Sequence, residues 1–454
     1  MGLFGGKAKK KASSAEEQLP PLELKPTAFD RNEAQGVLVA TRQLPGYPLA
    51  LSMMATAIKN RADRILMDFS AQGVAVRARV DGQWEAMAPM DRPTGDSALV
   101  VIKKLWGMNP NERRAKQEGK CAAAFLKGDW ILFVTSQGTS TGERVLISVE
   151  PKKPTLKSLS DLGMREKMQE TLKGYLNGHG LVLISAPAGH GLPTTWRVAL
   201  ESADRYMRDW QSIENKREPE PEMININPNY FDPTAQEKPE DILAKVILKQ
   251  PDVLVMPSLY NEESVKQVLF QLKAENKHCV TRIVANDPID AILALLTSYR
   301  GHAKELLDAV DCVLNQRLVR RLCESCRQTF QPSPQLLQKL GVPAGRVNQL
   351  YQPFVAPPPE QRVDAKGNPV EIEICTKCQG RGYLGRLAVF ELLEVKPELK
   401  AAFIKYAKTP DTLRQYARKL GHLSFQDEGL LAVATGLTSL QELQRLASAA
   451  KPAG

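Results

Sequence analysis

The sequence predicts an α/β protein that carries a smaller α+β domain before its main sheet. Residues 180–185 form a continuous apolar run without alternation, and such runs are typical of strands covered on both faces of a parallel sheet. Residues 253–256 and 279–284 predict two further strands of this sheet, and helical segments alternate with them. Strands that alternate with helices along the chain indicate the α/β class.

Length and composition are those of a folded protein with several domains. The chain has 454 residues, enough for two or three separate cores. Hydrophobic residues make up 43% and charged residues 25% of the chain, which excludes the fibrous and disordered classes. The formal net charge is +10, but the basic residues are spread along the chain and no DNA- or RNA-binding module is recognisable. We therefore expect no specific nucleic-acid partner.

The first part of the chain predicts a linker followed by the α+β domain. Residues 1–45 are rich in Lys, Ala, Glu and Pro, and predict a basic tail and linker. In the domain expected over residues 46–152, helices are predicted from Leu51 and over residues 98–106, and strands over residues 74–80, 130–135 and 144–149. The first of these strands alternates apolar and polar residues and ends at the turn Asp81-Gly82. Pro151 and Pro154 mark the end of this domain.

The rest of the chain divides into three predicted parts. Residues 153–322 form the α/β domain, which begins with a helix over residues 165–176. Residues 323–386 contain two cysteine pairs around a Pro-rich excursion. Residues 387–454 are rich in Leu and Ala, and predict C-terminal helices.

Four cysteines have the spacing of a metal site. The chain has seven cysteines, and an odd number without a secretory signal argues against a disulfide framework. Cys323-Glu-Ser-Cys326 and Cys375-Thr-Lys-Cys378 offer four thiolates, the ligand set of a closed structural zinc site. A redox-active pair is the alternative, but it leaves the second pair unexplained. We predict structural rather than catalytic zinc.

A glycine-containing loop, Ala186-Pro-Ala-Gly-His-Gly-Leu-Pro-Thr-Thr195, follows the first buried strand. A phosphate-binding loop occupies this place, because backbone N–H groups and a helix N-terminus converge there. Its candidate phosphate-binding residues are Gly189, Gly191, Thr194 and Thr195. Leu192 stands where such a loop has its lysine, and Pro193 stands where it has the hydroxyl that binds magnesium. Taken alone, the loop is better explained as a turn between a strand and a helix.

Residues 50–393 resemble the ATPases of type II secretion and type IV pilus assembly in the order of their landmarks. Gln316-Arg-Leu-Val-Arg-Arg-Leu-Cys-Glu-Ser-Cys326 is similar to the family's segment that leads into its first cysteine pair. Cys375-Thr-Lys-Cys378, followed by Gly382-Tyr-Leu-Gly-Arg386 and Phe390-Glu-Leu-Leu393, is similar to the second. Arg77-Ala-Arg-Val-Asp-Gly82 and Gly142-Glu-Arg144 resemble segments of the family's N-terminal domain.

The resemblance implies specific domains and ligands. It implies a RecA-like P-loop NTPase domain over residues 153–322, a PAS-like domain over residues 46–152 and a zinc-binding subdomain over residues 323–386. It also implies that arginines of the N-terminal domain reach the nucleotide phosphates, which makes Arg77, Arg79 and Arg144 the candidates here. Exposed charges on strand edges are an equally good explanation of these three.

The positions that carry the family's chemistry have diverged in this chain. Glu214 is retained in the acidic segment after the loop, but Ser258 stands in place of the glutamate that polarises water, and Val284 in place of a histidine. Leu192 and Pro193 replace two further functional residues, so the chain retains no intact catalytic set. Each lost electrostatic contact typically costs about 10²-fold to 10³-fold in rate. We expect turnover near background, with the binding of ATP and magnesium in question.

Three functional hypotheses follow. The first is a pseudo-ATPase that serves as a scaffold or regulator of a secretion or pilus machine. The second is an active motor whose missing lysine is replaced by Lys249 or Arg282. The third is a nucleotide-independent binding module that holds a cyclic dinucleotide or a partner protein on its N-terminal domain.

The resemblance also implies partners and a location. Members of the family form six-membered rings, so a homo-oligomer or hetero-oligomer is expected, together with contact to platform proteins of the inner membrane. No stretch approaches the roughly 20 apolar residues of a membrane helix, and residues 1–17 lack the apolar core of a secretory signal. These features predict a cytoplasmic protein that is peripheral at the inner membrane if the Lys-rich tail docks there.

Overall fold

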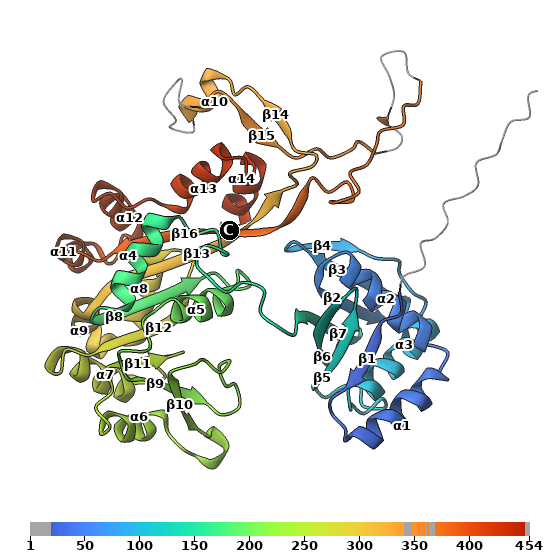
Figure 1. The fold of residues 1–454 in the computed structure, drawn as a ribbon, viewed down its shortest axis with the longest axis horizontal. Coiled ribbons are helices and arrows are strands. Elements are labelled where there is room, and N and C mark those ends of the chain that lie inside the picture. Colours follow the sequence, from blue (N-terminus) through green and yellow to red (C-terminus); the bar gives the residue numbers. More distant parts are fainter. Residues whose placement is uncertain (1–19, 340–346, 359–360, 363–367, 450–454) are drawn as a thin grey trace, which may run out of the picture. The chain divides into compact units, whose positions relative to one another are not determined.

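A computed structural model describes residues 20–339, 347–358, 361–362 and 368–449. The chain divides into two compact units, Met1–Thr155 and Leu156–Gly454 (Figure 1). The division lies close to the boundary that Pro151 and Pro154 predicted. Among the described residues no helix is long and apolar enough to span a bilayer.

The first unit is an antiparallel sheet of seven strands with three helices (Figure 1). The strand order is β1-β5-β6-β7-β2-β3-β4. Its elements are β1 (Glu23–Pro26), α1 (Arg31–Arg42), α2 (Tyr47–Lys59), β2 (Ala62–Ser70), β3 (Gly73–Val80), β4 (Gln83–Ala86), α3 (Arg92–Leu105), β5 (Gln117–Phe125), β6 (Gly128–Thr139) and β7 (Gly142–Pro151). Alternate residues of the strands are buried in one core with α2 and α3, as in β3, where Val74, Val76, Ala78 and Val80 are buried. The predicted half-buried strands are confirmed.

The structure differs from the linker predicted over residues 1–45. Leu22 and Leu24 are buried, and β1 pairs with β5 so that Leu24 lies opposite Ala123. The side chain of Asp30 caps α1 by accepting hydrogen bonds from the amides of Asn32 and Glu33. The sequence did not predict these elements because the segment is rich in Pro and Lys. The apolar pattern of an edge strand of four residues is also too short to be recognised.

The second unit is built on a mostly parallel sheet of seven strands, in the order β10-β9-β11-β12-β8-β13-β16 (Figure 1). Its strands are β8 (Gly180–Ala186), β9 (Trp210–Asn215), β10 (Ile226–Phe231), β11 (Val253–Met256), β12 (His278–Val284), β13 (Val310–Leu322) and β16 (Tyr383–Glu394). Its helices are α4 (Glu166–Leu176), α5 (Leu192–Glu201), α6 (Pro239–Ile247), α7 (Glu262–Ala274), α8 (Pro288–Ser298), α9 (Ala303–Ala309), α10 (Pro334–Lys339), α11 (Pro397–Tyr406), α12 (Pro410–Lys419), α13 (Phe425–Ala434) and α14 (Leu440–Ala449).

The predicted parallel strand over residues 180–185 is confirmed as β8, which lies inside this sheet between β12 and β13. Leu181 and Leu183 pack into one hydrophobic cluster, whereas Val182, Ile184 and Ala186 pack into another. The strand is therefore covered on both faces, which explains its lack of alternation. Its neighbours β12 and β13 both run parallel to it.

The cysteine-rich segment is an insertion between two strands of the main sheet. β13 ends at Leu322, one residue before Cys323, and its antiparallel partner β16 begins at Tyr383. Residues 383–386, predicted as the end of a zinc subdomain, thus open a sheet strand, and residues 387–394 continue it before the C-terminal helices begin. A small sheet of β14 (Gln328–Phe330) and β15 (Leu350–Gln352) lies inside the insertion.

A buried histidine begins β12 in the second unit. The His278 ring lies edge-on to Trp210, with 6.5 Å between the ring centroids, and its Nδ1 lies 3.0 Å from the carbonyl oxygen of Gly180. Arg208 and His179 are the charged or titratable groups that act on it. Burial first, and then the charge of Arg208, lowers the pKa of His278 to about 4. The imidazole is therefore neutral at pH 7.

His278 should make stability fall as the pH drops from about 6.5 to about 4. The unfolded chain protonates this residue near its ordinary pKa of about 6.5, whereas the folded chain resists protonation until about pH 4. The neutral His278 thus contributes its full stabilisation, about 3 kcal/mol, above pH 6.5. This contribution is lost as the pH falls from about 6.5 to about 4. In chemical denaturation, wild-type protein should lose about this much more unfolding free energy between pH 7 and pH 4 than His278→Gln. Equal losses in the two proteins would contradict the assignment.

Candidate functional site

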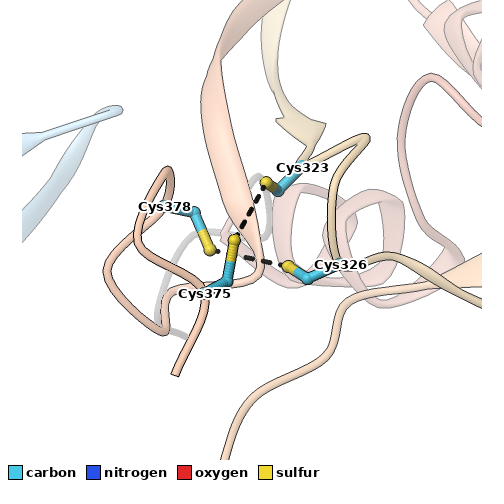
Figure 2. A group of neighbouring side chains, drawn as sticks. All are labelled: Cys323, Cys326, Cys375 and Cys378. Atoms are coloured by element: carbon cyan, nitrogen blue, oxygen red, sulfur yellow. Dashed lines mark hydrogen bonds between the residues drawn. The ribbon is translucent and has the colours of Figure 1, made fainter. Parts of the chain in front are cut away.

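The four predicted cysteine ligands come together in one cluster (Figure 2). Their sulfur atoms all lie within 4.8 Å of one another, and the Sγ–Sγ distances are 3.9 Å for Cys323–Cys375 and 3.6 Å for Cys326–Cys378. A regular tetrahedron with metal–sulfur distances of about 2.3 Å has sulfurs about 3.8 Å apart. The arrangement therefore fits a tetrahedral metal ion with no position left for water.

Backbone N–H groups donate hydrogen bonds to sulfur atoms of this cluster. The N–H of Gly382 points to the Cys378 sulfur at 3.3 Å. The amides of Cys378 and Lys377 lower the pKa of the Cys375 thiol to about 7. Because the thiolate is the metal-binding form, these hydrogen bonds favour the ligand state at Cys375. Burial acts the other way at Cys323 and Cys326 and raises the pKa of both thiols.

The cluster is tied to the sheet and to the last helices. The N–H of Cys323 donates to the carbonyl oxygen of Gly382 at 3.0 Å, and the guanidinium of Arg327 donates to the carbonyl oxygen of Gly436 at 2.6 Å. Arg327 also stacks over the Tyr351 ring, 4.5 Å from its centroid. A metal held here would join the segment after β13 to the segment before β16. Such a link is structural, because all four ligands come from the protein.

The loop after β8 has the backbone of a phosphate-binding loop. Gly189 and Gly191 both have positive φ angles, 78° and 85°, and Gly191 is the N-cap of α5. Thr194 and Thr195 follow in the first turn of α5, where Thr194 is half-buried and Thr195 is buried. The predicted strand, loop and helix N-terminus are thus present in the expected order.

The side chain at the position of the expected lysine packs into the core. Leu192 is only 9% exposed and belongs to the hydrophobic cluster of Trp196, Ile184 and Leu314. Pro193 lies in the first turn of α5, where it supplies neither an N–H nor a hydroxyl. The position of the expected lysine is therefore filled by an apolar contact.

Two residues of β13 donate hydrogen bonds to this loop. The Nε2 of Gln316 donates to the carbonyl oxygen of His190, and the N–H of Leu318 donates to the Nδ1 of His190 at 3.1 Å. Burial first, and then the charges of Arg317, Arg445 and Arg386, lowers the pKa of His190, so Nδ1 stays an acceptor. Nothing in the sequence pointed to this contact, because it depends on β13 lying beside β8.

The other predicted positions lie along the same edge of the sheet. Glu214, Ser258 and Val284 come at or after the carboxyl ends of β9, β11 and β12, which are parallel neighbours. The Glu214 carboxylate is 5% exposed and accepts hydrogen bonds from the Ser212 hydroxyl at 2.5 Å and from the Glu220 amide at 3.0 Å. Ser258 and Val284 are exposed. The retained Glu214 therefore stabilises its own strand and the loop that follows β9.

An ion pair that the sequence did not indicate lies at this edge. Arg282, on β12, donates two hydrogen bonds to the Glu220 carboxylate at 2.9 Å and 2.6 Å. Its guanidinium also lies 5.4 Å from the centroid of the Trp196 ring on α5. Arg282 was a candidate replacement for the missing lysine, but its charge is already neutralised by Glu220. Lys249 precedes β11, whereas the loop follows β8, so the two come from opposite ends of parallel strands.

The three candidate arginines of the first unit, Arg77, Arg79 and Arg144, are all paired with carboxylates of the same sheet. Arg77 and Arg144 each lie 2.6 Å from Asp68, and Arg79 makes two hydrogen bonds to Asp63. Burial acts to raise the pKa of Asp68, but the hydrogen bonds from Arg144 and Arg77 outweigh it and lower the value. The structure therefore brings Arg77 and Arg144 together on Asp68 and places Arg79 on a separate partner.

Comparison with known proteins places the whole arrangement in a family. The family model described as "Type II/IV secretion system protein" matches residues 42–445. "Type IV pilus assembly ATPase PilB" of Thermus thermophilus is 26% identical over 433 residues, which cover 94% of this chain and 44% of the relative. "Putative type II secretion system protein E" of Escherichia coli is 26% identical over 409 residues, which cover 89% of this chain and 77% of the relative. The chain thus spans less than half of the first of these relatives.

Solved structures support the fold. The Legionella pneumophila ATPase DotB matches with a TM-score of 0.54 at 12% identity, over 88% of this chain and 95% of that one. The pilus retraction motor PilT with bound ADP matches with a TM-score of 0.50 at 14% identity, over 88% of this chain and 96% of that one. The α/β fold with a RecA-like domain is confirmed. By its sequence match from residue 42 to residue 445, the chain belongs to the type II/IV secretion system protein family.

Proposed function

We propose that this chain is a pseudo-ATPase that serves as a scaffold or regulatory subunit of a type II secretion or type IV pilus machine. The observation that carries the proposal is the set of side chains in the loop after β8, where Leu192 packs into the core and residues of β13 donate hydrogen bonds to His190. A triphosphate needs positive charge and a metal-binding hydroxyl at these places. Here the first is a leucine and the second a proline.

The frame of the family is retained beside these losses, which favours a structural role. The seven-stranded sheet and the cysteine cluster are complete. We propose that the cluster holds one structural zinc ion, because four thiolates in a closed tetrahedron are its usual ligand set. We also propose that the chain acts in a homo-oligomeric or hetero-oligomeric ring, in the cytoplasm against platform proteins of the inner membrane, as the family resemblance implies.

The test is ATP hydrolysis by the purified full chain with magnesium, beside a relative whose loop keeps the lysine. With the lysine and the glutamate both absent, and about 10²-fold to 10³-fold lost for each, turnover should be at least about 10⁴-fold lower than that of the relative. Glu214→Gln should leave the residual rate unchanged. Clear turnover that falls in Glu214→Gln, Lys249→Ala or Arg282→Ala would instead establish an active motor.

A further inference from the structure

A cavity of about 700 Å³ lies in the first unit, beside the turn that joins β6 to β7. Thr139, Ser140 and Thr141 line it on the side of the turn, and Arg92, Arg113 and Arg114 line it as well. Small-molecule sites commonly have volumes of about 300–1,000 Å³. The cavity is thus large enough for a small organic ligand, and its lining is basic and rich in hydroxyl groups.

Two of the three arginines are fixed in place by Asp96. Arg92 Nε lies 3.0 Å and 3.1 Å from the two carboxylate oxygens, and Arg113 donates to the same carboxylate at 2.7 Å. Arg92 also donates to the carbonyl oxygen of Ser70 at 2.8 Å. Among the described residues, the guanidinium of Arg114 has no hydrogen bond or ion pair. The three guanidinium groups outnumber the two carboxylates beside them, Asp96 and Glu143, and Glu143 is paired with Lys103, so the cavity keeps an excess of positive charge.

The hydroxyl-bearing turn is also held rigidly. Glu143 follows it, is 2% exposed, and is bound by the fully buried Lys103 at 2.5 Å and by the Ser136 hydroxyl. At the other end of the turn, the N–H of Gly138 donates to the carbonyl oxygen of Arg114 at 3.1 Å. A Cβ on Gly138 would lie 2.9 Å from the carbonyl oxygen of Arg113, so only glycine permits this approach. The turn and the arginine segment are therefore fixed against each other before any ligand arrives.

We propose that this cavity binds a soluble phosphorylated small molecule. Guanidinium groups donate paired hydrogen bonds to phosphate oxygens, and hydroxyls of the neighbouring turn add further donors. Arg113 and Arg114 hold the phosphate, with Thr139 and Ser140 beside it. The volume exceeds what a single phosphate ion fills, which favours a phosphate ester or a diphosphate. This site lies in the first unit, whereas the loop after β8 belongs to the second, and its occupation does not depend on whether the chain hydrolyses ATP.

The experiment is calorimetric titration of the full chain with pyrophosphate at physiological salt. We expect saturable binding that becomes at least about tenfold weaker in Arg114→Ala, because one charge-assisted hydrogen bond is lost. Lys116→Ala is the matched control, since Lys116 is exposed, belongs to the same segment and does not line the cavity. Its affinity should equal that of the wild type.

A second arm separates free phosphates from lipid headgroups. Sedimentation with phosphatidylglycerol vesicles should be the same for wild type and Arg114→Ala. The proposal is overturned if pyrophosphate does not bind, if Arg114→Ala binds it as tightly as the wild type, or if only vesicle binding depends on Arg114. The experiment measures binding rather than turnover, and the Arg114→Ala variant assigns that binding to the cavity. A negative result therefore does not change the conclusion about ATP hydrolysis.

Discussion

Cys323→Ser is expected to abolish tight zinc binding and to destabilise the insertion between β13 and β16. A hydroxyl in place of one thiolate breaks the closed set of four sulfurs, whose distances fit a tetrahedral ion. In small zinc domains the metal contributes on the order of 10 kcal/mol to folding at neutral pH. In its described residues the segment contains a two-stranded sheet whose strands have three residues each. Its order should therefore depend on the metal.

Metal analysis and hydrogen exchange together check this expectation. Wild-type protein should hold one zinc ion per chain, and Cys323→Ser should hold none. The Cys323 amide, which donates to Gly382, should lose protection in the variant, whereas amides of β8 should keep theirs. Ser325 is exposed and lies between Cys323 and Cys326, so Ser325→Ala is the control and should retain the ion. A metal-free wild-type protein with this segment fully protected would rule out the site.

Lys103→Met should strongly destabilise the first unit. Lys103 is fully buried and Glu143 is 2% exposed, with 2.5 Å between Nζ and Oε1. The Lys103 ammonium also donates to the carbonyl oxygen of Glu112. Removing the lysine leaves the Glu143 carboxylate buried without its counter-charge, which typically costs about 3–5 kcal/mol. Amides of β6 and β7 should then exchange about 10²-fold faster or more.

The double variant Lys103→Met/Glu143→Leu distinguishes loss of the pair from loss of one partner. Replacing a buried ion pair by apolar side chains of similar volume is often neutral, so the double variant should recover most of the lost protection. Lys104→Met, the exposed neighbour on α3, should exchange like the wild type. A double variant that is less protected than Lys103→Met would show that the pair is not the reason for the effect.

The candidate site could be predicted from the sequence wherever its signal is local. The two cysteine pairs, the strand before the loop and the missing lysine are all readable from spacing and residue type. β1 and α1 were missed because their apolar pattern is short and lies in a Lys- and Pro-rich segment. The bounds of the insertion were misjudged because residues 383–394 become a strand only by pairing with β13.

By itself, the sequence determined that this protein has a parallel α/β core, an α+β domain and a four-cysteine cluster, and that the side chains expected to hold a triphosphate are absent. These features follow from hydrophobic periodicity and residue chemistry, which act over a few neighbouring positions. Only the tertiary structure decided where the Leu192 side chain packs, what neutralises Arg282 and where Arg114 meets the hydroxyl-bearing turn. The reason is physical: each of these contacts joins segments far apart in the chain, and strand order and burial, rather than local pattern, bring them together.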